Sequence, residues 1–236
     1  MLRVEPDELT DSHGRLPADV RVVGEPTEAP TAHDLAVGVG PWPGPWPDDD
    51  RYDPGLLADG DRRNVVDRYR YWTVEAIRAD LDTRRHPFHV AIENWQHDLN
   101  IGSVVRTANA FNTAGVHVVG RRRWNRRGAM VTDAYLSVVH HADGEDLARW
   151  AAAERLPLIG VDNLPGSLPI ETAELPRACV LVFGQEGPGL SEPVRQACDQ
   201  VLSIAQFGST RSINAAAAAA IAMHTWVRRH AVPPAG

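Results

Sequence analysis

Two glycine-rich turns in the last third of the chain are the segments best suited to bind a ligand. Residues 181–191 read LVFGQEGPGLS and residues 204–214 read IAQFGSTRSIN. In each segment an apolar, strand-like run leads into small residues and then into a predicted helix. Because glycine carries no side chain, a ligand can approach the main chain directly at such turns. The pattern predicts a binding site made largely of backbone.

A nucleotide phosphate is one candidate ligand for the first turn. Gly184, Gly189 and Ser191 stand where a Walker A motif has its two glycines and its hydroxyl, but Leu190 occupies the position of the lysine. The chain contains no lysine at all. The dinucleotide fingerprint also fails, because Glu192 stands where its third glycine belongs. Phosphate binding is therefore the weaker interpretation of this turn.

A short arginine-rich segment offers a different chemistry. Guanidinium groups bind phosphates and stack on bases, and an indole ring provides a further stacking face. The segment therefore predicts an RNA contact, and a solvated charged loop has equal support from the residues alone. The residues concerned are Arg121, Arg122, Arg123, Trp124, Arg126 and Arg127.

A third segment, NIGSVVRTA at residues 100–108, follows a predicted strand and opens a predicted helix. Arg106 would lie one turn into this helix, at the same end as Asn100 and above the strand tips. Taken alone, an arginine in a first turn is more often a surface or ion-paired residue than a functional one.

Composition limits the architecture. A chain of 236 residues with 43% hydrophobic content is long enough for one well-buried core and an extension. The net charge of −7 is unevenly placed, because residues 1–60 carry −9 and the remaining residues carry +2. The body of the chain is thus mildly basic and compatible with a polyanionic partner.

Membrane, metal and disulfide functions are not indicated. No apolar run reaches the length of a bilayer span, and the first residues lack an apolar signal-type stretch, so we expect a cytoplasmic protein without a membrane partner. Cys179 and Cys198 lack metal-spaced partners and are expected to be reduced, buried thiols. His140 and His141 are adjacent and must point apart, so no metal site is predicted.

Periodicity predicts the arrangement of elements. Residues 1–60 read as an irregular acidic extension rich in Pro and Gly, residues 61–85 hold an N-terminal helix over 64–82, and residues 86–236 form the main domain. Alternating strands and helices in that domain predict an α/β fold with a mostly parallel sheet and helices on both faces. The strands are 88–92, 116–119, 158–161, 180–183 and 201–204, and the helices are 100–111, 143–155, 191–197 and 212–230.

The three segments together are more specific than any one of them. NIGSVVRTA, then LVFGQEGPGLS, then a strand-end isoleucine followed by SIN and a small-residue helix resembles the three ordered motifs of the SpoU/TrmH-type SPOUT methyltransferases. These enzymes methylate ribose 2′-hydroxyls of RNA, and the resemblance covers residues 86–230.

The resemblance implies a C-terminal trefoil knot at about residues 180–230, a homodimer and S-adenosylmethionine as cofactor. It makes Arg106 the catalytic arginine, able to act across the dimer interface, with Asn100, Glu186, Ser212 and Asn214 in the same site. The cofactor would be held near Gly184, Ile204, Ser212, Ile213 and Asn214 and by the loop after Val161. The implied reaction is methylation of a ribose 2′-hydroxyl in tRNA or rRNA, without a metal.

Two departures from the family pattern keep alternatives open. Ala205 and Gln206 replace a usual Pro-Met pair, which makes the second turn less rigid, and Ala215 and Ala216 replace a usual Val-Ser pair. The first alternative is a catalytically weak or silent protein of the same fold that binds RNA as an assembly factor. The second is an enzyme that methylates a base instead of a ribose.

Overall fold

The computed structural model describes residues 38–95 and 100–232 of the chain. They fall into two compact units, whose described parts are residues 38–48 with 53–71 and residues 49–52 with 72–95 and 100–232. Residues 1–37, which make up most of the predicted extension, lie outside the described residues.

The smaller unit is built around one short helix and one buried carboxylate. Helix α1 (Pro54–Asp59) begins after Asp53, whose side chain accepts hydrogen bonds from the backbone N–H groups of Gly55 and Leu56. Asp61 is fully buried and accepts from Arg63 and from the N–H of Tyr71. Burial alone would raise the pKa of Asp61, but these hydrogen bonds hold it at about 2.

Two predictions for this region need correction. Residues 54–59 are helical and not irregular, because Asp53 and Pro54 together form a helix start. The helix predicted over 64–82 is shorter: it is α2 (Val74–Asp82), preceded only by the 3₁₀ turn η2 (Asp67–Tyr69). The apolar spacing before residue 74 does not continue as a helix, because Tyr71 has a positive φ of 64° and Thr73 caps a new start.

The larger unit contains a seven-stranded sheet in the order β3-β2-β1-β6-β4-β7-β5, and every strand pairing in its described residues is parallel. The predicted α/β class with a mostly parallel sheet is confirmed. The strands are β1 (His86–Asn94), β2 (Thr113–Gly120), β3 (Val138–His141), β4 (Leu158–Val161), β5 (Leu168–Pro169), β6 (Cys179–Phe183) and β7 (Gln200–Ser203).

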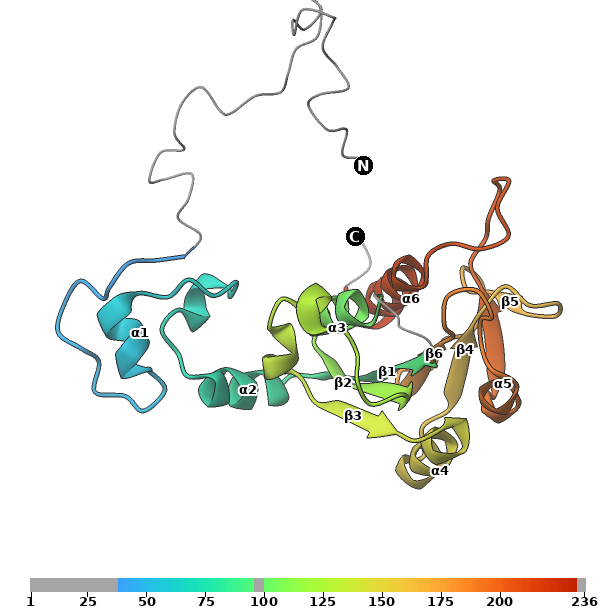
Figure 1. Cartoon of the computed structure of the whole chain (residues 1–236), viewed down its shortest axis with the longest axis horizontal. Coiled ribbons are helices and arrows are strands. Elements are labelled where there is room, and N and C mark those ends of the chain that lie inside the picture. The colour runs from blue at the N-terminus through green and yellow to red at the C-terminus, as the bar shows by residue number, and fades with distance from the viewer. Residues whose placement is uncertain (1–37, 96–99, 233–236) are drawn as a thin grey trace, which may run out of the picture. The chain divides into compact units, whose positions relative to one another are not determined.

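Helices cover both faces of this sheet, as predicted (Figure 1). Two pack on one face, where the indole of Trp226 stacks on Phe88 with ring centroids 4.2 Å apart. The other two pack on the opposite face through Leu147 and Val194. The first pair is α3 (Asn100–Ala110) and α6 (Ala215–His230), and the second is α4 (Gly144–Glu154) and α5 (Glu192–Ala197).

A row of three imidazoles crosses the face that α4 covers. His89 Nδ1 lies 3.0 Å from His117 Nε2, His117 Nδ1 lies 2.8 Å from His141 Nε2, and His141 Nδ1 lies 3.2 Å from a carboxylate oxygen of Asp146. The indole of Trp150 packs on the central ring, with centroids 4.0 Å apart. Burial lowers the pKa of His117 to about 3 and that of His89 to about 4, so the row is neutral at physiological pH.

Candidate active site

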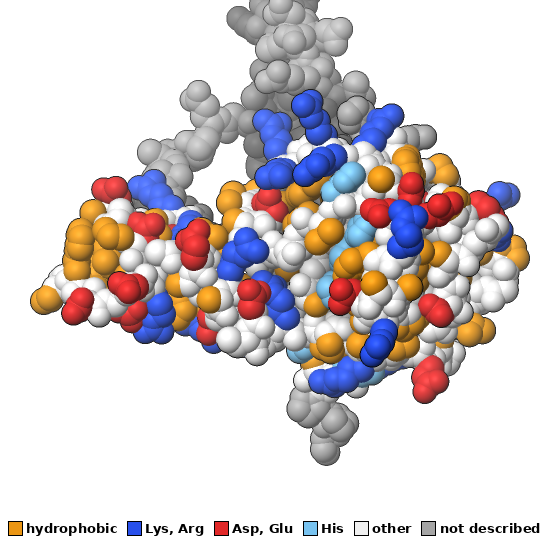
Figure 2. Space-filling view, turned by 90° about the horizontal axis from the view of Figure 1, so that it is seen from below, with side chains coloured by type: hydrophobic (Ala, Val, Ile, Leu, Met, Phe, Trp, Pro, Cys, Tyr) orange, Lys and Arg blue, Asp and Glu red, His pale blue; other side chains and the backbone are white. Residues whose placement is uncertain are grey.

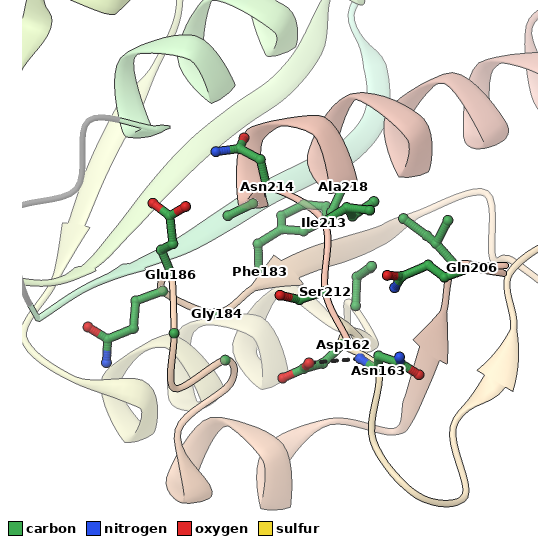
Figure 3. A pocket seen from close by; sticks show the side chains of 16 residues that line it. Asp162, Asn163, Phe183, Gly184, Glu186, Gln206, Ser212, Ile213, Asn214 and Ala218 are labelled. Atoms are coloured by element: carbon green, nitrogen blue, oxygen red, sulfur yellow. Dashed lines mark hydrogen bonds between the residues drawn. The ribbon is translucent and has the colours of Figure 1, made fainter. Parts of the chain in front are cut away.

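A cavity opens at the carboxyl ends of β4, β6 and β7, in front of the first turn of α6 (Figure 3). Its volume is about 250 Å³. Ligands in parallel sheets bind at this end of the strands, because the loops that follow them converge there. The lining comes from the loop after Val161, the turn after Phe183, the loop around Ile204 and residues 212–218.

The turn after β6 brings two stretches of main chain together. A Cβ atom placed on Gly184 would lie 2.0 Å from the carbonyl carbon of Gly189, so no side chain fits there. Gly189 has a φ of +73°, and its N–H donates to the carbonyl of Gln185 at 3.1 Å. The side chain of Asp162, which directly follows β4, accepts a hydrogen bond from the N–H of Leu190 at 2.8 Å. This bond ties the turn after β6 to β4, its neighbour in the sheet. Gly184 therefore serves close packing of backbone, and Gly189 permits the positive φ of this turn.

Three side chains from distant segments join in one hydrogen-bonded chain. The amide of Asn100 donates to a carboxylate oxygen of Glu186 at 3.0 Å, and the amide of Asn214 donates to the side-chain oxygen of Asn100 at 2.9 Å. The side-chain oxygen of Asn214 caps α6 by accepting from Ala216 and Ala217. We call Asn100, Glu186 and Asn214 the amide–carboxylate network.

The remaining residues expected from the sequence divide into two groups. The residues expected around the cofactor all border the cavity, and Glu186 borders it too; they are Gly184, Ile204, Ser212, Ile213 and Asn214. Arg106 does not border it. Its side chain is exposed on α3 and makes no hydrogen bond or ion pair within the described residues.

The loop after Val161, which the sequence placed near the cofactor, contributes Asp162 and Asn163, and both border the cavity beside Ser212 and Gln206 (Figure 3). The amide of Asn163 donates to the carbonyl of Arg211 at 3.1 Å, which ties the loop after β4 to the loop before α6. A signal was present, because two polar residues directly follow the apolar strand 158–161 at its carboxyl end.

Thiol and metal chemistry find no support in the described residues. Burial raises the pKa of Cys179 and of Cys198 to about 12, so both thiols stay protonated at neutral pH, and neither forms a disulfide. The described residues contain no cluster of three or more His, Cys, Asp or Glu side chains that could hold a metal ion. His140 and His141 point apart, as expected: His140 Nε2 lies 2.7 Å from the carbonyl of Gly120, and His141 belongs to the imidazole row.

Comparison with known proteins assigns the family. Residues 87–224 match the model of the SpoU rRNA methylase family. The chain belongs to this family. The match begins in β1 and ends in α6, and so spans all the strands and the whole cavity lining. No helix in the described residues of this SpoU family member is long and apolar enough to cross a membrane.

Relatives of this SpoU family chain carry names of RNA methyltransferases. It is 34% identical over 183 residues to an uncharacterized tRNA/rRNA methyltransferase of Mycolicibacterium vanbaalenii, covering 71% of this chain and 56% of that protein. It is 25% identical over 191 residues to YacO of Bacillus subtilis, named as a TrmH family tRNA/rRNA methyltransferase, covering 73% of each. The chain spans about half the length of several curated relatives that it matches.

Solved structures agree with this assignment. The SpoU methyltransferase AviRb of Streptomyces viridochromogenes, crystallised with AdoMet, superposes with a TM-score of 0.56 at 28% identity, covering 64% of this chain and 60% of that one. The TrmH/SpoU tRNA-modifying enzyme of A. aeolicus shares the fold, with a TM-score of 0.58 at 16% identity over 66% of this chain and 81% of the other.

Proposed function

We propose that this protein transfers a methyl group from S-adenosylmethionine to the ribose 2′-hydroxyl of a nucleotide in tRNA or rRNA. The observation that carries the proposal is the amide–carboxylate network at the mouth of a glycine-walled cavity. It joins motif residues that lie 86 and 114 positions apart in the sequence, through hydrogen bonds of 3.0 and 2.9 Å. Membership of the SpoU family supports the reaction class.

The cavity has the chemistry that S-adenosylmethionine requires. Phe183, Ile204 and Ile213 supply apolar surface for an adenine ring. The polar groups of Asp162, Asn163, Gln206 and Ser212 border the same space, and the crowded turn at Gly184 leaves main chain to face a ligand. We infer that these residues hold the cofactor, which when bound supplies a methyl group made electrophilic by its sulfonium.

The chain's own residues would then position the ribose. Transfer to a hydroxyl needs orientation of that hydroxyl in line with the methyl group, which the amide–carboxylate network can provide because each member is fixed by another. The hydroxyl must also lose its proton. A guanidinium is always protonated at neutral pH, so Arg106 is not a base. We infer that Arg106 binds the neighbouring phosphate and stabilises developing negative charge, while that phosphate or a water molecule takes the proton.

The exposed position of Arg106 supports a site completed by a second subunit. Arg106 does not border the cavity of its own chain, although its motif partner Asn100 joins the network there. We therefore propose a homodimer in which Arg106 of one subunit serves the cavity of the other. With the family assignment we also propose a trefoil knot at about residues 180–230. The hydrogen bond from Asn163, in the loop after β4, to Arg211, in the loop before α6, is compatible with such a knot.

The test combines cofactor binding with methyl transfer. S-adenosylmethionine is titrated into the full chain by calorimetry, and transfer of its tritiated methyl group into bulk tRNA and bulk rRNA is then measured separately. The proposal predicts binding and label in one RNA pool. Absence of binding would favour the alternative of a silent RNA-binding protein, for which Ala205 and Gln206 in the second turn are the motivating residues.

A further inference from the structure

A second groove, of about 410 Å³, lies beside the edge strand β3 and shares no lining residue with the cavity. Its polar lining comes from α2, the loop after β2, residues 133–137, and β3 itself. Basic side chains gather along one margin of the face in Figure 2, next to histidine side chains. We call the following five lining residues the arginine groove: Arg78, Arg122, Trp124, Arg126 and His140.

The groove carries positive charge that the described residues do not neutralise. Arg126 pairs with Asp133, with 3.3 Å between Nη1 and the carboxylate oxygen. Arg78 and Arg122 are exposed, and neither makes an ion pair or side-chain hydrogen bond within the described residues. Three guanidinium groups thus line the groove with one carboxylate. Such a concentration of cations in a concave surface attracts a polyanion.

The backbone of residues 121–127, which we call the arginine loop, is held in place by the protein core. Asn94 is buried at the end of β1, and its amide donates to the carbonyl of Arg121 at 2.6 Å and to that of Arg123 at 3.0 Å. Trp124 packs against the core cluster, and the guanidinium of Arg126 lies 5.6 Å from the centre of its indole ring. This part of the groove is therefore formed before any ligand arrives, which reduces the entropy lost on binding.

The combination of groups points to a nucleic acid. Guanidinium forks on opposite elements suit the oxygens of successive phosphates, and an indole–guanidinium pair offers a flat surface on which a base can stack. An acidic protein segment would use the charges but would gain little from the stacking surface. The groove is also large enough to accept a nucleotide unit.

We propose that the arginine groove binds the sugar-phosphate backbone of the substrate RNA at nucleotides outside the one that is methylated. The proposal rests on the proposed function for the identity of the RNA. It changes the prediction drawn from the sequence in two ways: Arg78 of α2 joins the RNA contact, and the arginines of the loop are no longer equivalent. Arg122 and Arg126 line the groove, whereas Arg121, Arg123 and Arg127 do not.

This difference allows a test with matched charge. The groove variant carries Arg78→Gln and Arg122→Gln, and the control variant carries Arg121→Gln and Arg123→Gln. Both lose two positive charges from exposed side chains. Affinity for bulk tRNA and for bulk rRNA is measured by filter binding over a salt series. Melting temperature and S-adenosylmethionine affinity, measured for both, show that the fold and the cavity are intact.

The proposal predicts that the groove variant loses about tenfold or more in RNA affinity at low salt, and that its salt slope falls by about 1 to 2, since each phosphate contact contributes about 0.7 to 0.9. The control should lose clearly less. In the transfer assay the groove variant should show a raised KM for RNA with kcat nearly unchanged. Equal losses of RNA affinity in the two variants, or no loss in either, would contradict RNA binding in the arginine groove. Failure of the wild-type chain to transfer methyl groups would instead count against the proposed function. The comparison of RNA affinities would still show whether the arginine groove binds RNA.

Discussion

Asn214 illustrates how one side chain can serve both the fold and the site. Its oxygen caps α6, and its amide nitrogen donates to Asn100 within the amide–carboxylate network. These two roles can be separated, because serine is as good a helix cap as asparagine but is too short to keep the second contact.

Asn214→Ala should lower the free energy of unfolding by about 1 kcal/mol, the usual value of a lost cap. Asn214→Ser should leave the melting temperature nearly unchanged. Both variants should reduce methyl transfer, on the order of 10²-fold, because the network loses its link to α6. Thermal unfolding and transfer assays measure the two effects. Wild-type turnover by Asn214→Ser would show that the network does not contribute to catalysis.

Arg106 should be sensitive to a change that keeps its charge. A lysine places one compact charge where the guanidinium presents a planar fork, so Arg106→Lys should lose geometry-specific binding of a phosphate. We expect kcat to fall by about 10²-fold or more, in the range seen when one charge-stabilising donor is removed. Single-turnover kinetics at saturating RNA measure this, and retention of most of the turnover would contradict a clamping role.

The turn after β6 offers a sharp test of the cofactor site. Gly184→Ala places a methyl group against the backbone of Gly189, and the turn must shift to accept it. We expect weaker S-adenosylmethionine binding, together with a loss of stability of about 1 to 3 kcal/mol. Gly40→Ala, in the smaller unit, is the matched control, because nothing lies within 4 Å of the added atom. Calorimetric titration measures the affinity of both variants for S-adenosylmethionine. Wild-type affinity in Gly184→Ala would exclude this turn from the cofactor site.

The imidazole row predicts how the sheet responds to acid. The pKa of His117 is lowered to about 3 and that of His89 to about 4 in the fold, against an ordinary value of 6.5. The unfolded chain therefore binds protons that the folded chain does not. The free energy of unfolding should fall as pH drops from about 6.5 toward 4, by up to about 1.4 kcal/mol per pH unit for each site.

A variant separates this effect from other titrations. His117→Gln keeps a polar side chain in the row but removes one titrating group, so its melting temperature should fall less steeply between pH 6.5 and 4.5. Asp61 does not contribute in this window, because its pKa is about 2 in the fold and a free carboxylate titrates near 4. Parallel curves for the variant and the wild type would mean that the row does not set the acid response.

The elements also show what sequence patterns can and cannot reveal. The strand predicted at 158–161 matches β4 residue for residue, and the helix predicted at 143–155 corresponds to α4 with Asp143 as its cap, because continuous apolar runs and capping residues are local signals. The sequence did not indicate the strand β3 because two of its four residues are histidines, and their partners on β2 could not be known in advance. The two-residue β5 is too short to show any period.

The candidate site likewise has features that local sequence patterns reveal and features that only the fold reveals. The glycine turns and the polar loop ends could be located from the sequence, because strand ends converge in a parallel sheet. The contact between Asn100 and Asn214 could not be derived from periodicity, because it depends on the order of strands in space. Nor could the sequence separate Arg122 from Arg123, since only the fold decides which one lines the groove.

The proposed dimer makes a quantitative prediction. Subunits with Arg106→Ala are co-expressed with subunits carrying Asn214→Ala. If Arg106 serves the partner's cavity, one of the two sites in each mixed dimer keeps both residues, and random pairing gives about a quarter of the wild-type activity. If Arg106 acts within its own subunit, every site lacks one residue and the mixture stays as inactive as either variant alone. Sizing of the mixture by light scattering checks that dimers form.

The position of the methyl group on the RNA tests the proposed reaction most directly. Bulk tRNA and rRNA are labelled by the full chain with tritiated S-adenosylmethionine and then digested with alkali, which cleaves RNA through attack by the free 2′-hydroxyl. Ribose methylation blocks this attack, so the proposed reaction should give label in alkali-resistant dinucleotides from one RNA pool. Label in mononucleotides would show base methylation, and no label in either pool would contradict an RNA methyltransferase.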